Sequence, residues 1–210
     1  MSGHDHEHPT APMNRRVGIL ERALVSRGAI STEQVDGILD LFSREMGAAN
    51  GARYVARAWR DPEFRARLLA DAPAVLREYG HDLRGTGNPE LARLRLVVVE
   101  NTPSTHNVVV CTLCSCYPVP LLGPPPAWYR SNEYRARVVR EPRAVLAEFG
   151  VTLDLSVRIQ VWDSTADSRY LVLPMRPAGT EHLTEAALAA LVTPQSLVGT
   201  GLPVVDPVSS

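Results

Sequence analysis

The stretch PEFRARLLADAPAVLREYG, from Pro62 to Gly80, occurs a second time in the chain as NEYRARVVREPRAVLAEFG, from Asn132 to Gly150. The two stretches are identical at 9 of 19 positions without a gap, and most other positions are close in kind. The match extends upstream, where Trp59 aligns with Trp128 after one insertion. The chain therefore contains an internal duplication.

Each copy predicts two helices followed by a strand. Proline interrupts the helical run at Pro73 and at Pro142, because it lacks a backbone donor and clashes with the preceding turn. Gly80 and Gly150 stand where a helix end favours a residue that can adopt positive φ. Downstream, RLVVVENT from Arg95 aligns with RIQVWDST in the second copy, and both runs are rich in the β-branched residues typical of strands.

Two further apolar runs, HNVVVC at 106–111 and SRYLVLP at 168–174, follow the repeated strands closely. Their spacing predicts a β-hairpin in each copy. Helices packed on about four strands give an α+β fold, with a layered α-β-β-α domain that contains the helix-helix-strand duplication. We assign this domain to residues 50–210.

Residues 1–13 predict a disordered tail, because they hold no periodic apolar pattern, and residues 14–49 predict a helical arm. Ser31 and Gln34 have the spacing of a capping box at the start of its second helix. The apolar stripe of that helix consists of Val35, Ile38, Leu39, Phe42 and Met46. We expect the rest of the chain or a partner subunit to cover this stripe.

Composition limits the classes of function. The 210 residues carry 22 basic and 23 acidic side chains, a formal net charge of −1, so there is no basic footprint for nucleic acid or an anionic membrane. The first residues lack an apolar signal core, and no window approaches the roughly 20 apolar residues of a membrane span. We expect a cytoplasmic protein, since a reducing compartment keeps thiols available for metal.

All three cysteines lie in one stretch, VVVCTLCSCYP, as Cys111, Cys114 and Cys116. The stretch follows an expected strand and leads into YPVPLLGPPP, which predicts a stiff loop or extended segment and no helix. Structural zinc favours four protein ligands, and His106 would point away along an extended strand. An iron–sulfur cluster normally takes four cysteines, and a redox C-x-x-C pair accounts for two of the three thiols.

A fourth solution uses the backbone. Deprotonated amides of Ser115 and Cys116 could chelate a metal together with the sulfurs of Cys114 and Cys116, while Cys111 supplies an axial sulfur. Five ligands in a six-coordinate site leave one position open, as a catalytic metal site requires. Such donors suit trivalent iron or cobalt better than zinc.

The chain resembles the α subunit of nitrile hydratase, on the motifs VCTLCSCYP, GPPPAWYRS, VWDSTADSRYLVLPMRPAGTE and LAALVT. In that family, Cys-Thr-Leu-Cys-Ser-Cys goes with non-corrin cobalt, and iron enzymes tend to have serine in place of Thr112. The resemblance therefore implies one Co(III), with iron less favoured. It implies an unmodified axial thiolate at Cys111, a sulfinic acid at Cys114 and a sulfenic acid at Cys116, with amide nitrogens from Ser115 and Cys116.

The resemblance further implies hydration of a nitrile to its amide, with Cys116, Cys114 and Ser115 at the reacting centre. Donors to the oxidised sulfurs would come from two arginines of a β subunit, of one or two chains, and a metallochaperone or activator would load the metal. Thr112, Asp163 and Arg169 would hold the cysteine loop in place.

Two departures from the family bear on the substrate. Ala92 stands near a position where many relatives have glutamine, and Val119 stands where many have tryptophan after Tyr-Pro. Both changes predict a roomier pocket, suited to a large aromatic or heterocyclic nitrile such as a nucleobase-like one. Two alternatives stay open: the cobalt-bearing subunit of thiocyanate hydrolase, and a non-catalytic zinc-binding module.

Overall fold

The computed structural model describes residues 11–35, 47–80, 95–113 and 116–204. The chain divides into two compact units, Met1–Arg44 and Glu45–Ser210, which are described separately below. Among the described residues, no helix is both long enough and apolar enough to span a lipid bilayer.

The first unit contains helix α1, Ala11–Ser26, which starts three residues before the helical arm predicted from residue 14. The expected capping box is present, because Ser31 N donates to Gln34 Oε1 at 2.8 Å and Gln34 N donates to Ser31 Oγ at 3.1 Å. Residues 32–35 are helical, and the remaining members of the predicted stripe lie outside the described residues.

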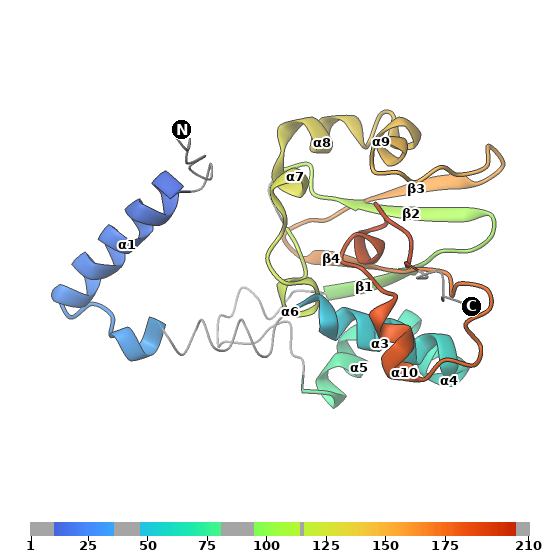
Figure 1. Ribbon diagram of the computed structural model, residues 1–210, viewed down its shortest axis with the longest axis horizontal. Helices are drawn as coiled ribbons and strands as arrows, with labels where there is room; N and C mark the ends of the chain where they lie inside the picture. Colours follow the sequence, from blue (N-terminus) through green and yellow to red (C-terminus); the bar gives the residue numbers. More distant parts are fainter. Residues whose placement is uncertain (1–10, 36–46, 81–94, 114–115, 205–210) are drawn as a thin grey trace, which may run out of the picture. The chain divides into compact units, whose positions relative to one another are not determined.

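Four strands form the centre of the second unit, at the positions that the sequence predicts (Figure 1). They are β1 (Arg95–Glu100), β2 (Thr105–Val110), β3 (Arg158–Asp163) and β4 (Ser168–Leu173). Strand β1 pairs in parallel with β4, and β2 pairs in parallel with β3. Each strand therefore pairs with a strand of the other copy.

The predicted hairpins are wrong for this reason. The connections 101–104 and 164–167 carry the chain from one two-stranded sheet to the other, so the strands that they join do not pair with each other. Residues 106–110 of β2 are all buried, which is the pattern of a strand covered on both faces. Two apolar runs joined by a short connection can form a hairpin, or each can pair with a strand of the other copy. Burial of β2 on both faces favours pairing with the other copy.

The duplication is visible in matching hydrogen bonds at the strand ends. One matched pair is Arg95 N to Asp167 O (2.8 Å) and Arg158 N to Ser104 O (2.9 Å). The other is Asn101 N to Leu173 O (2.9 Å) and Ser164 N to Val110 O (2.7 Å). The two copies therefore occupy equivalent places in one pseudo-symmetric core.

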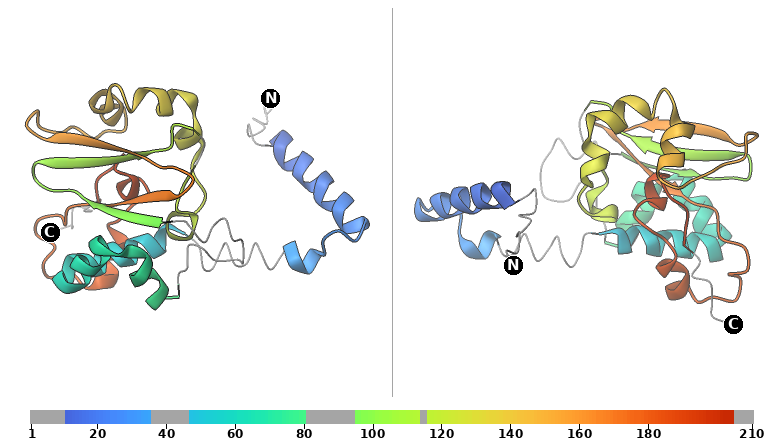
Figure 2. Two further views of the ribbon diagram at one scale, coloured as in Figure 1. Left: turned by 180° about the vertical axis from the view of Figure 1, so that it is seen from behind. Right: turned by 45° about the horizontal axis from the view of Figure 1, so that its top comes forward.

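Helices from the two copies lie on opposite sides of the strands (Figures 1 and 2). The first copy supplies α3 (Ala48–Arg60), α4 (Pro62–Ala70) and α5 (Ala72–Glu78), and α10 (Glu185–Ala190) packs against α3. The second copy supplies α7 (Ala127–Arg130), α8 (Asn132–Arg137) and α9 (Pro142–Glu148). The remaining described elements are α6 (Val119–Leu122) and the 3-10 helix η2 (Ser196–Val198).

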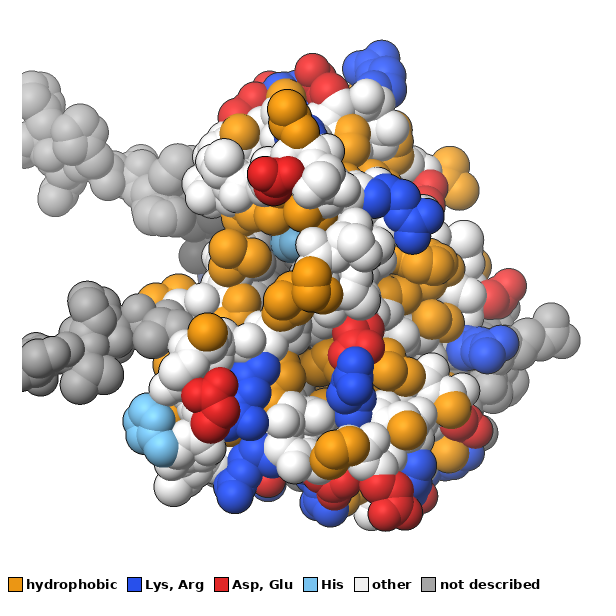
Figure 3. Space-filling view, turned by 90° about the vertical axis from the view of Figure 1, so that its right-hand side faces the viewer, with side chains coloured by type: hydrophobic (Ala, Val, Ile, Leu, Met, Phe, Trp, Pro, Cys, Tyr) orange, Lys and Arg blue, Asp and Glu red, His pale blue; other side chains and the backbone are white. Residues whose placement is uncertain are grey.

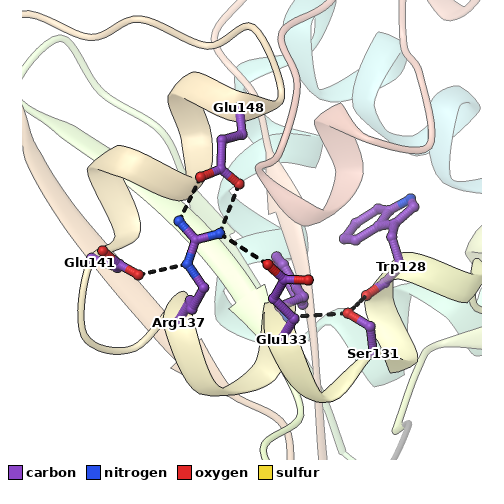
Figure 4. Close-up of polar contacts among 7 residues, drawn as sticks. Trp128, Ser131, Glu133, Arg137, Glu141 and Glu148 are labelled. Atoms are coloured by element: carbon purple, nitrogen blue, oxygen red, sulfur yellow. Dashed lines mark hydrogen bonds and ion pairs between the residues drawn. The ribbon is translucent and has the colours of Figure 1, made fainter.

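In each copy, an ion pair at the same position of the repeat links the two consecutive helices. Arg67 bonds Glu78 across α4 and α5, and Arg137 bonds Glu148 across α8 and α9 at 2.5 Å. Arg137 also reaches Glu141 at 2.6 Å and Glu133 at 3.5 Å, so three carboxylates surround one guanidinium (Figure 4).

Candidate metal centre

The first cysteine lies in a buried position directly after the carboxyl end of strand β2. Val108, Val109 and Val110 are fully buried, and Cys111, the next residue, is 1% exposed. Because β2 and β3 are parallel and in register, Val110 lies opposite Asp163 at the end of β3. The strand pairing therefore places an acidic side chain beside the start of the cysteine loop.

Asp163 holds this start of the loop through both carboxylate oxygens. The backbone N–H of Thr112 donates to Oδ1 at 2.9 Å, and the Thr112 hydroxyl donates to Oδ2 at 2.5 Å. Hydrogen bonds to an ionised acceptor are stronger than neutral ones, so the pair fixes the residue that directly follows Cys111.

Two tyrosines of the second copy hold the end of the loop and the strand that leads into it. The Tyr129 hydroxyl donates to the carbonyl oxygen of Cys116 at 3.1 Å, and the rings of Tyr117 and Tyr129 meet edge to face at 4.8 Å. The Tyr134 hydroxyl donates to the carbonyl oxygen of Val109 at 2.8 Å, in the strand that leads into the loop. Sequence reasoning missed both hydroxyls.

The segment after the loop differs from its prediction in one respect. Val119–Leu122 forms one helical turn, which we had excluded because of its prolines. Proline is tolerated in the first turn of a helix, where its missing N–H has no intrahelical acceptor, and Pro120 stands there. The Pro120 carbonyl accepts from Asn50 Nδ2 at 3.0 Å, which ties this turn to helix α3.

Both described thiols lie near the Tyr129 side chain. Burial raises the pKa of Tyr129, and the nearby Cys111 and Cys116 raise it further. Cys111 belongs to the hydrophobic core, and the half-buried Cys116 packs against it. Two soft sulfur donors, five residues apart in sequence, therefore lie in the core or against it, near the Tyr129 side chain.

His106 is engaged elsewhere. Its Nε2 lies 2.7 Å from the Gly199 carbonyl oxygen, and its Nδ1 lies 3.3 Å from Asn101 Nδ2. A neutral ring with its proton on Nε2 satisfies both contacts, and burial lowers the pKa of His106 below its ordinary value. Both nitrogens are thus used, which agrees with leaving His106 out of the ligand set.

The other predicted site residues are placed as follows. Arg169 donates to carbonyl oxygens of its own connection, at Thr165, at Ala166 (3.3 Å) and at Ser168 (3.2 Å). Val119 is partly buried and packs against the core. Cys114, Ser115 and Ala92 lie outside the described residues.

The donor set fits a thiophilic metal ion. In the described part of the chain, no group of three or more histidine, cysteine, aspartate and glutamate side chains is positioned to hold a metal. The described segment that brings thiols together is the cysteine loop, which Asp163 holds at one end and Tyr129 at the other. Thiolates favour transition metals over hard cations such as magnesium.

Comparison with known proteins gives one consistent family. The family described as "Nitrile hydratase, alpha chain" matches residues 11–201. The low-molecular weight cobalt-containing nitrile hydratase subunit alpha of Rhodococcus rhodochrous is 50% identical over 97% of both chains. Thiocyanate hydrolase subunit gamma of Thiobacillus thioparus is 42% identical, over 92% of this chain and 84% of that one. An Fe-type nitrile hydratase structure from Comamonas testosteroni Ni1 superimposes with a TM-score of 0.84 at 39% identity, covering 97% of this chain and 98% of that one.

Proposed function

The chain belongs to the nitrile hydratase α-chain family, and we propose that its cysteine loop, Cys111 to Cys116, holds one non-corrin Co(III) ion at which a nitrile is hydrated. The reaction adds one water molecule across the carbon–nitrogen triple bond and yields the primary amide. The chain is thus one subunit of a hetero-oligomeric lyase. The observation that carries the proposal is the cysteine loop that starts at the buried Cys111 and whose two ends are held by Asp163 and Tyr129.

We assign the ligands by the family pattern. Cys111 would supply a thiolate, Cys114 and Cys116 would supply oxidised sulfurs, and the backbone nitrogens of Ser115 and Cys116 would complete the set. A bound cobalt ion supplies Lewis acidity at this position. The sulfenate of Cys116 would serve either as a nucleophile toward the nitrile carbon or as a base toward water. We place the enzyme in the cytoplasm, because a reducing compartment keeps the thiols available until the metal is loaded.

Cobalt is favoured over iron by two observations. Thr112 occupies the position at which the family's iron enzymes tend to have serine. A relative with 50% identity is cobalt-containing by name, whereas the Fe-type neighbour is 39% identical. Elemental analysis of the purified enzyme tests the choice. Stoichiometric iron would correct the metal, and stoichiometric zinc with unmodified thiols would leave only a binding module.

An α subunit of nitrile hydratase implies a β subunit. Helix α1 supports a partner, because Val17, Ile19 and Leu20 are 55%, 55% and 61% exposed. The negative oxidised sulfurs also need donors, which we assign to arginines of the β subunit, and we expect an activator to deliver cobalt. The purified chain alone, loaded with cobalt, should be inactive, and addition of the β subunit should restore turnover. Full activity of the isolated chain would contradict the assignment.

Replacement of the cysteines tests the loop itself. Cys114→Ser and Cys116→Ser should abolish both cobalt uptake and turnover of the assembled enzyme. Thr102→Ala, in the connection between β1 and β2, is the control and should retain both. Mass spectrometry of the parent should find two or three added oxygens on the cysteine peptide. Full activity in either serine variant would refute the site.

Thiocyanate hydrolysis is the alternative activity, favoured by the 42% identity to thiocyanate hydrolase subunit gamma. The two activities are separated by assaying the same cobalt-loaded preparation with a nitrile and with thiocyanate. Turnover of the nitrile with negligible turnover of thiocyanate supports the main proposal, and the reverse replaces it.

We further propose a preference for bulky aromatic or heterocyclic nitriles, on Val119 and Ala92. Loss of a tryptophan and a glutamine leaves room and removes contacts that position small substrates, at a cost on the order of 1–3 kcal/mol. A large ring recovers this through burial. The parent enzyme should have a higher kcat/KM for a heteroaromatic nitrile than for acetonitrile, and Val119→Trp should lower it for the large substrate alone. A preference of the parent for acetonitrile would refute the proposal.

A further inference from the structure

An arginine in the first copy of the repeat is bound to the end of the first repeated strand. Arg65 on α4 donates to Glu100, the last residue of β1, from Nε to Oε1 at 2.5 Å and from Nη2 to Oε2 at 2.6 Å. This two-pronged contact is the strongest geometry for an arginine–carboxylate pair. It fastens the helix to the strand end.

The second copy contains the same two groups. Arg135 on α8 aligns with Arg65 in the repeated stretch, and Asp163 at the end of β3 corresponds to Glu100 at the end of β1. Here, however, both carboxylate oxygens accept from Thr112 at the start of the cysteine loop. The residue that corresponds to Thr112 after β4 is Met175, which has no hydroxyl. The acidic residue at the strand end therefore contacts a helix in the first copy and the cysteine loop in the second.

Arg135 still lies beside that loop. Thr112 and Arg135 line one surface pocket of about 490 Å³, together with Asn132, Ala136, Val139 and Arg140. Arg135 also donates through Nη2 to the Asn132 side chain, one turn earlier on the same helix. Asn132 occupies the place of Pro62, which offers no such acceptor. The second copy thus holds its arginine on the loop side of the helix.

We propose that Arg135 is a positioning residue of the metal centre, whose positive charge beside Thr112 offsets the negative charge of Asp163 and of the anionic cysteine loop. The inference rests on the proposed function, since thiolates and deprotonated amides give the loop its excess negative charge. Attraction between unlike charges does not require contact, so the guanidinium acts across the pocket that it shares with Thr112 without touching the metal. It keeps the loop in the conformation that retains the ion.

The test compares four variants of the cobalt-loaded hetero-oligomer: Arg135→Gln, Arg135→Lys, Arg65→Gln and Arg140→Gln. Arg65→Gln controls for loss of a helix-to-strand contact, and Arg140→Gln controls for loss of a charge in the same pocket. Four quantities are measured: the rate of cobalt loss to a chelator, the hydrogen exchange of peptide 111–117, kcat and KM.

Arg135→Gln should lose cobalt roughly tenfold faster than the parent, the size of effect typical of groups that orient metal ligands. Peptide 111–117 should exchange faster, and kcat should fall with KM nearly unchanged. Arg135→Lys should recover most of the retention, Arg65→Gln should behave like the parent, and Arg140→Gln should lose clearly less cobalt than Arg135→Gln. A parent that binds no cobalt contradicts the proposed function. If the parent binds cobalt and Arg135→Gln retains it equally well, Arg135 has no positioning role. The same conclusion follows if Arg65→Gln or Arg140→Gln loses cobalt as fast as Arg135→Gln.

Discussion

The two copies of the repeat build the same frame and end in different ways. After β2, the chain continues into the cysteine loop, held by Asp163 and Tyr129. After β4, at the equivalent place, the carbonyl of Pro174 accepts from Trp59 Nε1 at 2.7 Å, and Arg176 donates to the Trp59 carbonyl at 3.2 Å. The end after β4 is thereby closed by hydrogen bonds to helix α3, whereas the end after β2 leads into the segment that carries the sulfur donors.

Figure 3 views the molecule from the right-hand side of Figure 1, the side of the β1–β2 connection and the closed end. Hydrophobic side chains gather in the middle of this face and are bordered by charged ones.

The comparison of the two copies teaches that duplication supplies two equivalent strand ends, and that a few substitutions distinguish the end that carries the cysteine loop. Three of those positions are Cys111 for Pro174, Thr112 for Met175 and Tyr134 for Phe64.

The largest effect is expected where the C-terminal segment, outside the duplication, locks strand β2. Gly199 has φ +81°, and a Cβ placed there would lie 1.8 Å from the Asn107 carbonyl oxygen. Gly199→Ala should lower the free energy of unfolding by about 2–5 kcal/mol, because a left-handed residue with a side chain and a backbone clash both add cost. Denaturant unfolding of the assembled enzyme measures it.

Gly150→Ala is the matched control. Gly150 ends α9 with φ +80° and has open space around the Cβ position, so only the backbone cost of about 1–2 kcal/mol applies. Equal losses in the two variants would show that close packing on β2 contributes nothing, and would remove the argument that the C-terminal segment supports the strand that carries the loop.

The second prediction separates the two acidic strand ends. Asp163→Asn removes the charge that accepts both Thr112 hydrogen bonds and should lower activity or cobalt affinity by about 10–100-fold. Glu100→Gln, at the equivalent position, weakens a partly exposed ion pair with Arg65 and should leave kcat within roughly twofold. Steady-state kinetics and cobalt content measure both. A larger loss in Glu100→Gln would mean that the copies have been assigned the wrong roles.

The third prediction concerns the hydroxyl that distinguishes Tyr134 from Phe64. Tyr134→Phe leaves the buried Val109 carbonyl without this donor and should cost about 1–3 kcal/mol of unfolding free energy. Tyr79→Phe gives the first copy the ring that the second has at Phe149, and Tyr79 is 43% exposed, so its change should stay within about 0.5 kcal/mol. If both substitutions cost the same, the Tyr134 hydroxyl does not support the strand.

Much of this organisation follows from local sequence pattern. The four strands and the Ser31–Gln34 capping box are short-range features, the duplication is found by comparing two such segments, and the structure has all three. Strand partners could not be inferred in the same way, because β1 and β2 could pair with each other or with strands that lie more than fifty residues away in sequence. Pairing is decided by burial over the whole domain, which no single window contains.

The residues of the candidate site likewise divide into those that the sequence indicates and those that only the tertiary structure brings together. The cysteines mark themselves by their clustering, and Asp163 was found through a family resemblance. Tyr129 and Tyr134 were missed because their hydroxyls matter only once α7 and α8 are placed against β2 and the loop. One signal was available: Phe64 and Tyr134 differ by a hydroxyl at an aligned, apolar position of the duplication. A polar atom gained on the core side of one copy indicates a partner that the other copy lacks.

The smallest effect is expected at the ion pairs that close the helix pairs. Arg137 faces Glu133, Glu141 and Glu148, whereas Arg67 bonds Glu78 (Figure 4). The hydrogen bond from Arg137 lowers the pKa of Glu148 below its ordinary 4.5. A depressed carboxyl pKa means that the folded state binds the proton less tightly than the unfolded state, so the stabilisation is present above pH 4.5 and is lost as the pH falls through the folded-state pKa.

Glu148→Gln should therefore lower Tm slightly at pH 7 and low salt, and the difference from the parent should shrink as the pH falls below 4.5 or as salt is added, since the pair is exposed and screened. Glu78→Gln should have a similar or smaller effect at pH 7, because its partner Arg67 is more exposed than Arg137, 47% against 26%. Thermal unfolding at several pH values measures both variants. A Tm difference for Glu148→Gln that grew on acidification would reverse the sign of the argument and assign the effect to packing of the side chain.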